Sequence, residues 1–190
     1  MPPEAINGRL TAALKTVFSA GEADGLARLI QGVGGDGEVA YQAIDLPETE
    51  RDDIILLAYE ERLLIPCASR PGSAWEDRVL SLAPGAVYFM PRVVKALMDS
   101  AALSGGLNPD DAVRKALSEA GDEPVAGMLA LFKALQPHTV ARQIEAGLMA
   151  IIHRRTTPGL DLHDTLDQFV LAGMMSPCPS RSIATGLAWY

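Results

Sequence analysis

The sequence predicts a mostly α-helical protein with small β-hairpins, an α+β fold. Apolar residues recur at helical spacing through most of the chain. The period changes after a helix at two places, residues 63–69 and the stretch from residue 174 onward, which indicates extended segments there. Apolar residues make up 48% of the 190 residues and charged residues 21%, so the chain is able to bury a core.

The N-terminal part begins with two expected helices. Residues 4–18 follow an amphipathic helical period, and Gly21 is a suitable stop. A second helix is expected over residues 23–31, before the glycine-rich stretch 32–37. That stretch matches the letters GxGxxG of dinucleotide-binding loops, but it follows a helix instead of a strand, and its Asp36 would face the pyrophosphate. We interpret it as a loop.

Residues 38–66 predict a helix, a tight turn at Pro47 and a second helix beginning at Thr49. The first helix is expected over residues 39–44. The following extended segments are expected over residues 63–69, 78–82 and 86–90, with a turn or wing tip at residues 70–73.

Further helices are expected along the rest of the chain. Pro91 opens one that ends at Gly105, and Asn108 caps the next, which ends at Gly121. These two helices are expected to bridge the halves of the molecule. The C-terminal part predicts helices over residues 125–136, 139–155 and 161–172, followed by an extended tail over residues 174–190. We divide the chain into residues 1–90, a helical linker at 91–122, and residues 123–190.

Residues 63–70 and 174–181 look like copies of one segment, displaced by 111 positions. Pro, Cys, Ser and Arg coincide in the two copies, and an amphipathic helix precedes each. With these features the chain resembles the winged helix-turn-helix superfamily, in which three helices are followed by a hairpin whose turn forms the wing. The resemblance implies two winged-helix-like units, and its second copy departs from the pattern in the longer turn at residues 156–160.

Charge is distributed unevenly along the chain. The net charge of −8 means that the whole protein repels polyanions such as nucleic acid. Residues 1–123 hold 11 Lys and Arg against 20 Asp and Glu, while residues 124–190 hold 5 against 4. A contact with phosphates is therefore expected only in the C-terminal third. No membrane span or secretory signal is recognised, which predicts a cytoplasmic protein.

No pattern predicts a catalytic, cofactor-binding or metal site. Cys67 and Cys178 share the setting Pro-Cys-Xaa-Ser-Arg, where an arginine would favour a reactive thiolate, although a small buried side chain is the favoured interpretation. A redox-responsive protein using these cysteines is the third hypothesis for function. His138, His153 and His163 lack metal-ligand spacing and are expected at the surface or at helix caps.

The leading hypothesis is a non-enzymatic regulatory or adaptor protein whose winged-helix units bind another protein or a second copy, as in a homodimer. It depends on the acidic helix of the first unit, where six Asp and Glu oppose two Arg. The candidate protein-interaction residues are Glu60, Glu61, Trp75, Trp189 and Tyr190.

The alternative hypothesis is a DNA-binding transcriptional regulator acting through residues 139–190, which the net charge disfavours. The candidate nucleic-acid-binding residues are Arg142, His153, Arg154, Arg155 and Arg181.

Overall fold

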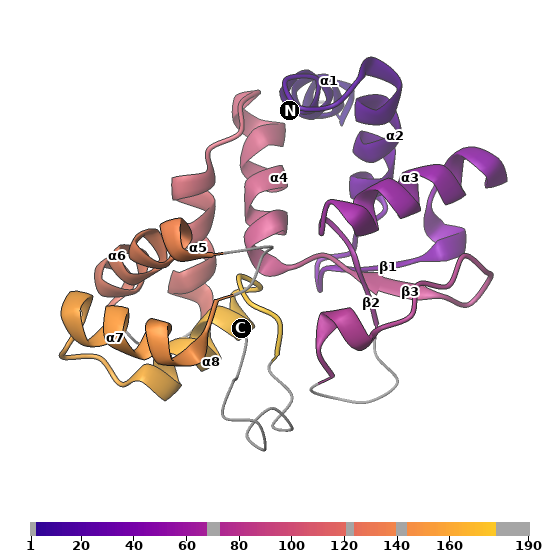
Figure 1. The fold of residues 1–190 in the computed structure, drawn as a ribbon. Helices are drawn as coiled ribbons and strands as arrows, with labels where there is room; N and C mark the ends of the chain where they lie inside the picture. The colour runs from indigo at the N-terminus through magenta and orange to yellow at the C-terminus, as the bar shows by residue number, and fades with distance from the viewer. Residues whose placement is uncertain (1–2, 68–72, 121–123, 140–143, 178–190) are drawn as a thin grey trace.

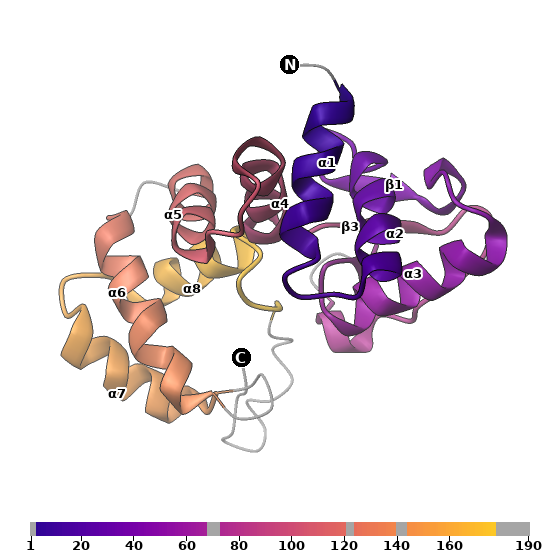
Figure 2. The ribbon, with the colours of Figure 1, turned by 90° about the horizontal axis from the view of Figure 1, so that it is seen from above.

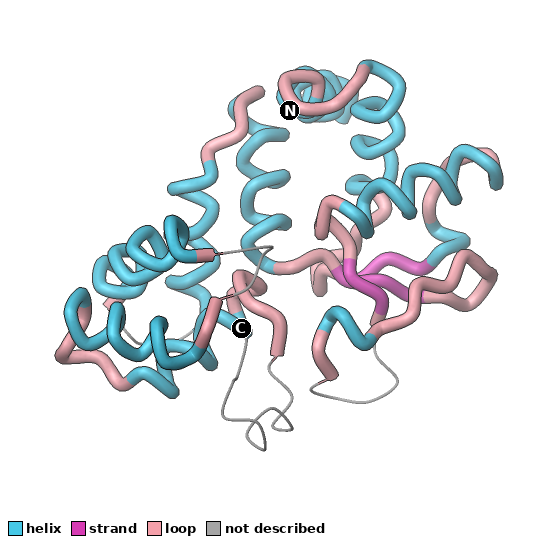
Figure 3. Tube along the Cα trace, in the orientation of Figure 1, coloured by secondary structure: helices cyan, strands magenta, loops and turns pink. Residues whose placement is uncertain are grey.

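The structure is a computed structural model that describes residues 3–67, 73–120, 124–139 and 144–177. Within these ranges the chain is mostly helical with one small antiparallel sheet, which confirms the predicted α+β class (Figures 1 and 3). The α-helices are α1 (Pro3–Leu14), α2 (Ala20–Gln31), α3 (Glu48–Glu60), α4 (Arg92–Ser104), α5 (Pro109–Ala120), α6 (Val125–Leu135), α7 (Ala146–Thr156) and α8 (Leu162–Leu171). The strands are β1 (Glu38–Ala40), β2 (Ile65–Pro66) and β3 (Val87–Phe89), and three 3-10 turns are η1 (Tyr41–Ala43), η2 (Trp75–Asp77) and η3 (Gln136–His138).

Capping side chains and glycines set several helix boundaries. The first is not as predicted: α1 ends at Leu14 instead of residue 18, and Gly21, the expected stop, lies inside α2. At the start of α2 the Ser19 hydroxyl accepts a hydrogen bond from the Glu22 N–H, and the Glu22 carboxylate accepts one from the Ser19 N–H. Asn108 accepts from the Asp111 N–H at 3.3 Å. Gly105 ends α4 in the left-handed conformation, with φ +80°. In the described part of the chain, none of the helices has the length and apolar character to cross a membrane.

Residues 39–44 do not form the predicted helix. They form the end of β1 and then the 3-10 turn η1, because Val39 pairs with Tyr88 in the sheet. Both side chains are buried, so the pair gains more from the core than a short isolated helix would. The expected helix-turn-helix is therefore a strand, a 3-10 turn and the helix α3.

The sheet has the strand order β1-β3-β2, with β3 antiparallel to both neighbours. Ile65 of β2 lies opposite Phe89 of β3. Residues 78–82, predicted as the second strand of the hairpin, carry no strand pairing, and residues 87–89 take that place. The reason is that Tyr88 is the buried residue of this stretch, and its hydroxyl donates a hydrogen bond to the Ser81 carbonyl from beneath the loop.

One apolar core lies between α1, α2, α3, α4 and the sheet. Its largest fully buried side chains belong to three helices, to the turn after η1 and to the regions of β2 and β3: Leu14, Leu26, Leu29, Ile44, Ile55, Leu64 and Tyr88. Met98 and Ala101 bring α4 into the same core. Helix α4 is thus part of the N-terminal packing as well as a connection to the rest of the chain.

A second apolar core lies between α5, α6, α7 and α8, with Leu117, Met128, Leu131 and Phe169 fully buried. The prediction of one helix over residues 139–155 is wrong at its start: α7 begins at Ala146, where the Glu145 side chain accepts hydrogen bonds from the Gly147 and Leu148 N–H groups. Residues 174–177 form no strand, and residues 178–190 of the predicted tail lie outside the described residues.

The two cores meet where α8 ends and α4 begins. The Val93 N–H in the first turn of α4 donates a hydrogen bond to the Ala172 carbonyl at the end of α8. The N–H group and the carbonyl group both lie at helix ends, where they have no partner within their own helix. Gly173 follows with φ +73°, and the bonds from Gly173 to Val170 and from Met174 to Phe169 complete a Schellman motif. Figure 2 shows α4 between the sheet-containing half and helices α5–α8.

Candidate protein-interaction surface

The helix α3 packs one side on the N-terminal core and leaves the other side exposed. Ile54, Ile55 and Ala58 are its buried residues. Gly25 of α2 allows the close approach, because a Cβ atom at this position would lie 2.5 Å from Ile54 Cδ1. In Figure 1 α3 lies on the side of the molecule away from α6 and α7. Its outer side is therefore not covered by the C-terminal helices.

The exposed side of α3 carries a row of four residues that we call the α3 face: Thr49, Asp53, Leu56 and Glu60. Their spacing of four, three and four positions puts them on one line along the helix. The Leu56 side chain is 42% exposed although it is large and apolar. Three further exposed acidic residues flank the row, namely Glu48, Glu50 and Glu61. The α3 face is thus an apolar side chain within an acidic surface.

The two arginines of this region do not project from the α3 face. Arg51 donates hydrogen bonds to the carbonyls of Ile44 and Leu46, at 3.1 and 2.6 Å, with its guanidinium 4.9 Å from the Tyr41 ring centroid. Arg62, in the left-handed conformation with φ 58°, lies 5.4 Å from the centroid of the neighbouring Tyr59 ring. Both cations are therefore used within the fold, and the helix presents mainly negative charge.

Asp52 is held beside the α3 face by the turn η1. The Tyr41 hydroxyl donates a hydrogen bond to Asp52 Oδ1 at 2.8 Å. This bond is the main cause that raises the pKa of Tyr41, because it stabilises the protonated phenol next to a carboxylate. The contact joins α3 to η1 and helps to fix the orientation of the helix.

The loop between β2 and β3 corresponds to the predicted wing. Trp75, a candidate contact residue, is half-buried and packs edge-on against Phe89, with ring centroids 6.2 Å apart. Arg78 donates hydrogen bonds to the carbonyls of Ser73 and Pro66, which ties the middle of the loop to the end of β2. Val79, by contrast, is 86% exposed. The structure therefore places Trp75 in the support of the loop, while its neighbour Val79 faces solvent.

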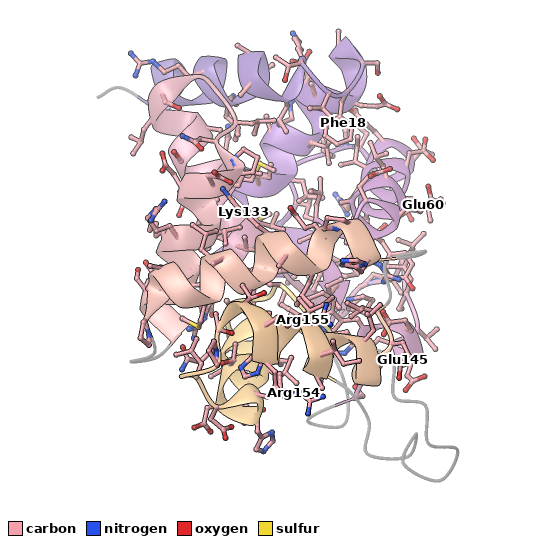
Figure 4. The ribbon with its side chains drawn as sticks, turned by 60° about the vertical axis from the view of Figure 1, so that its left-hand side comes forward. Phe18, Glu60, Lys133, Glu145, Arg154 and Arg155 are labelled. Carbon is pink, nitrogen blue, oxygen red and sulfur yellow. The ribbon has the colours of Figure 1, made fainter. Side chains whose placement is uncertain are left out.

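The predicted cationic set is not brought together within the described residues. Arg154 and Arg155 are exposed in the last turn of α7 (Figure 4), where they complement the negative end of the helix. His153 is only 5% exposed, and its Nε2 atom is buried without a hydrogen-bond partner. The expectation that it is a surface or capping residue is wrong, because it lies on the same side of α7 as buried Met149. Arg142 and Arg181 lie outside the described residues, as do Trp189 and Tyr190.

The helix α8, the candidate recognition helix of the second unit, is acidic on its exposed side. Asp161 caps its N-terminus by accepting hydrogen bonds from the His163 and Asp164 N–H groups, and these bonds lower the pKa of the Asp161 carboxyl. Asp164 and Asp167 are exposed further along. Helix α8 therefore offers no cationic surface to a phosphate backbone.

Cys67 is a half-buried thiol at the end of β2. Its Sγ atom lies 3.9 Å from Glu38 Oε1. Burial, followed by the nearby Glu38 charge, raises the pKa of Cys67, and the Arg78 cation offsets this only in part. This environment favours the unreactive protonated thiol. Cys178 lies outside the described residues.

The glycine-rich stretch 32–37 is the connection between α2 and β1, as expected for a loop. Gly37 adopts φ +87°, and its N–H donates to the Gly34 carbonyl in a tight turn. Among the described residues, no three His, Cys, Asp or Glu side chains are grouped so that they could hold a metal ion.

The signal for the α3 face is present in the sequence, but only Glu60 belongs to both the α3 face and the predicted contact residues. With Ile54, Ile55 and Ala58 directed to the core, helical spacing leaves Leu56 on the opposite side. Asp53 and Thr49 lie on the same side as Leu56. The fold therefore adds an apolar centre to a surface that the sequence describes only as acidic.

The described part of the chain is mostly helical, and the exposed side of α3 is acidic. A protein-family model of uncharacterised function matches residues 23–189, and the chain belongs to that family. No curated protein and no solved structure matches the chain.

Proposed function

We propose that this chain is a non-enzymatic regulatory or adaptor protein that binds another protein through the α3 face of a winged-helix unit. The proposed unit comprises residues 20–90. Its element order is a helix, a strand, a short 3-10 turn, a helix, and two strands joined by a loop. The third strand lies between the first two in the sheet, which is the strand arrangement of winged-helix domains. In this interpretation α3 occupies the position of the recognition helix.

The observation that carries the proposal is the charge and polarity of α3. A helix that enters a DNA groove needs Lys or Arg side chains directed to phosphates and bases. Here Asp53, Leu56 and Glu60 occupy the outward positions, while Arg51 is bonded to backbone carbonyls on the inner side. Such a surface repels DNA, and it presents an apolar anchor of the kind found in protein interfaces.

The C-terminal part is proposed as a second winged-helix-like unit that supports or extends the same interaction. Its helices α6, α7 and α8 correspond to the three helices of such a unit. The hairpin expected to follow falls on residues 178–190, outside the described residues. What supports this assignment is the order of the helices and the repeated sequence that begins at residues 63 and 174. The two copies differ in structure, because Ile65–Pro66 form β2 while residues 174–177 form no strand.

The test of the adaptor function begins with capture of a partner from a cell extract on the immobilised full-length chain. The captured protein is identified, purified and titrated against the chain. We expect the double substitution Glu60→Lys and Glu61→Lys to weaken binding at least tenfold. The matched control, Arg154→Glu with Arg155→Glu, should leave the affinity within about twofold. Equal affinities of the two double variants would contradict the proposed role of α3.

DNA binding through residues 139–190 is the second candidate function, and the exposed pair Arg154 and Arg155 is the observation that favours it. A duplex-binding protein would show affinity at low salt that falls steeply as the salt concentration rises. We expect no measurable binding of mixed-sequence duplex DNA even at low ionic strength. Binding that is lost in the Arg154→Glu, Arg155→Glu variant would favour this alternative instead.

A further inference from the structure

We infer that residues 173–177 form a strap by which the second half of the chain holds the η2 loop (residues 73–86), so that this loop is released when the end of α8 opens. The central observation is the Ser176 hydroxyl. It accepts a hydrogen bond from the Trp75 N–H at 2.8 Å and donates one to Glu76 Oε2 at 3.0 Å, across 101 and 100 positions of the sequence. The inference concerns a different surface from the α3 face and does not depend on the function proposed for it.

Ser176 serves the turn η2 as an N-terminal cap that comes from another part of the chain. Trp75 is the first residue of η2, and the first N–H groups of a helical turn have no acceptor within that turn. The preceding residue, Ala74, has no side-chain oxygen and makes no capping hydrogen bond. The Ser176 hydroxyl takes this place, and its second bond orients the Glu76 carboxylate. Loss of Ser176 therefore leaves the start of η2 without a cap.

The strap is continuous with the end of α8. The N–H groups of Met174 and Met175 both donate hydrogen bonds to the Phe169 carbonyl, at 2.9 and 3.3 Å. The side chains of the same two methionines pack against the second core. Ser176 follows directly, so the end of α8 sets the position of its hydroxyl. An opening of this helix end therefore withdraws the cap from η2.

On the loop side, η2 belongs to a small aromatic cluster that packs on β3. The Trp75 ring lies edge-on to Phe89, and the Arg78 guanidinium lies 5.1 Å from the Phe89 ring centroid. The Arg78 N–H also donates to the Trp75 carbonyl at 3.2 Å. The next residue, Val79, is 86% exposed. The strap therefore acts through η2 on the part of the loop that presents an apolar side chain to solvent.

The contact between strap and loop opens without disruption of either core. Glu76 is exposed, and Ser176 and Trp75 are half-buried, so water replaces their hydrogen bonds when the strap leaves. The η2 loop therefore has a held state and a released state. A partner that binds one state better shifts the equilibrium towards it by the difference in affinity. By reciprocity, a partner that prefers the held loop also stabilises the end of α8.

The experiment measures amide hydrogen exchange in the full-length chain, with Trp75 as the reporter of the loop and Val93 as the reporter of the end of α8. Ser176→Ala should accelerate exchange at Trp75 about fivefold, as expected for the loss of one hydrogen bond, and leave Val93 within about twofold. Ser176→Thr keeps a hydroxyl and should stay within about twofold of wild type at both reporters. Ser118→Ala is the matched control, because this hydroxyl donates to the Lys115 carbonyl within α5, and it should change neither reporter.

The coupling is tested from the other side with Gly173→Ala, whose added Cβ would lie 2.7 Å from Pro91 Cβ and displaces the segment after α8. This variant should accelerate exchange at Trp75 at least fivefold together with exchange at Val93. If the variant does not fold, native-state exchange of the wild-type chain decides. Because an opening of the α8 end releases Ser176, the Trp75 amide should not be more protected than the Val93 amide.

Four results would overturn the inference. They are unchanged exchange at Trp75 in Ser176→Ala, equally fast exchange in Ser176→Thr, acceleration at Val93 alone in Gly173→Ala, and a Trp75 amide that is more protected than Val93 in wild type. The adaptor function fails separately, because it depends on the effect of the Glu60 and Glu61 substitutions on partner binding.

Discussion

Replacing Gly173 by alanine should disturb the junction between the two cores more than it disturbs either core. A Cβ atom at this position would lie 2.7 Å from Pro91 Cβ and 2.8 Å from the Arg92 backbone N. Neither neighbour is the end of a flexible side chain, so the segment after α8 has to move away from α4. That movement also breaks the hydrogen bond from the Val93 N–H to the Ala172 carbonyl.

The loss of stability is the sum of three effects. The left-handed backbone at Gly173 costs about 1 kcal/mol with any Cβ. Overpacking against Pro91 adds about 1 to 3 kcal/mol, and the lost backbone hydrogen bond about 1 kcal/mol. We therefore expect the free energy of unfolding to fall by about 3 to 5 kcal/mol. Gly105→Ala is the matched control, because Gly105 has φ +80° and its added Cβ would have no neighbour closer than 3.9 Å.

The assay is equilibrium urea denaturation of both variants, followed by circular dichroism, with hydrogen exchange of the α4 and α8 amides measured alongside. Gly105→Ala should cost only about 1 kcal/mol and leave exchange at Val93 unchanged. Gly173→Ala should in addition accelerate exchange at Val93 and make the two cores unfold less cooperatively. If both variants lose the same stability, the tight contact between Gly173 and α4 does not hold the cores together.

Three further predictions concern single side chains. In a Cys178→Ser variant Cys67 is the one remaining thiol. It should react with a disulfide reagent at neutral pH at least tenfold more slowly in the folded than in the urea-unfolded protein, because burial and Glu38 raise its pKa. Equal reaction rates would support the redox hypothesis instead. Burial raises the pKa of Tyr88 to about 12, so folding favours its neutral form. Its contribution to stability should be complete below about pH 10 and be lost as the pH rises towards 12, which thermal melts and phenolate absorbance of wild type and Tyr88→Phe would measure. Ser176→Ala removes the acceptor of the Trp75 N–H bond at 2.8 Å, so hydrogen exchange at Trp75 should accelerate with a loss of about 1 kcal/mol, and unchanged exchange would show that this contact does not hold the loop.

The sequence predicts best those elements whose limits are local. Gly105, Asn108 and the break at residues 32–37 mark helix ends through backbone conformation and capping, which act within a few residues. The helices on either side of these signals are accordingly found close to the expected positions. Helix α3 is also expected correctly, because Ile54, Ile55 and Ala58 define its buried side.

Non-local pairing explains the main errors. Residues 39–44 have a pattern that fits a short helix, but Val39 finds its partner Tyr88 almost fifty residues later, and no local signal announces this. The same competition moves the hairpin strand from residues 78–82 to β3. A prediction based on the hydrophobic period alone identifies apolar residues, but it does not identify the strand with which they pair.

The sequence predicts the negative charge of the candidate site, but it does not predict which side chains the folded protein exposes there. The excess of Asp and Glu over Arg in residues 48–61 is visible directly in the sequence. The sequence does not show that Arg51 turns inward to the Ile44 and Leu46 carbonyls, because these acceptors are created by the turn η1. His153 is the converse case: the sequence predicts it at the surface or at a cap, with Ile151 on the buried side of the helix. In the structure His153 and Met149 are buried, and Ile151 is 41% exposed.

Helix α4 also determines how this chain tolerates being divided. Met98 and Ala101 of α4 complete the packing of the first half, whereas Val93 of the same helix packs against the second. A protease or a gene rearrangement that cut before residue 91 would leave the first half with an open apolar side and a tendency to aggregate. A cut in the short connection between α4 and α5 would leave the packing of the first half complete. The second half alone would lose a contact, the one with Val93 of α4. Evolutionary exchange of one half for another is therefore expected to carry α4 along with residues 1–90.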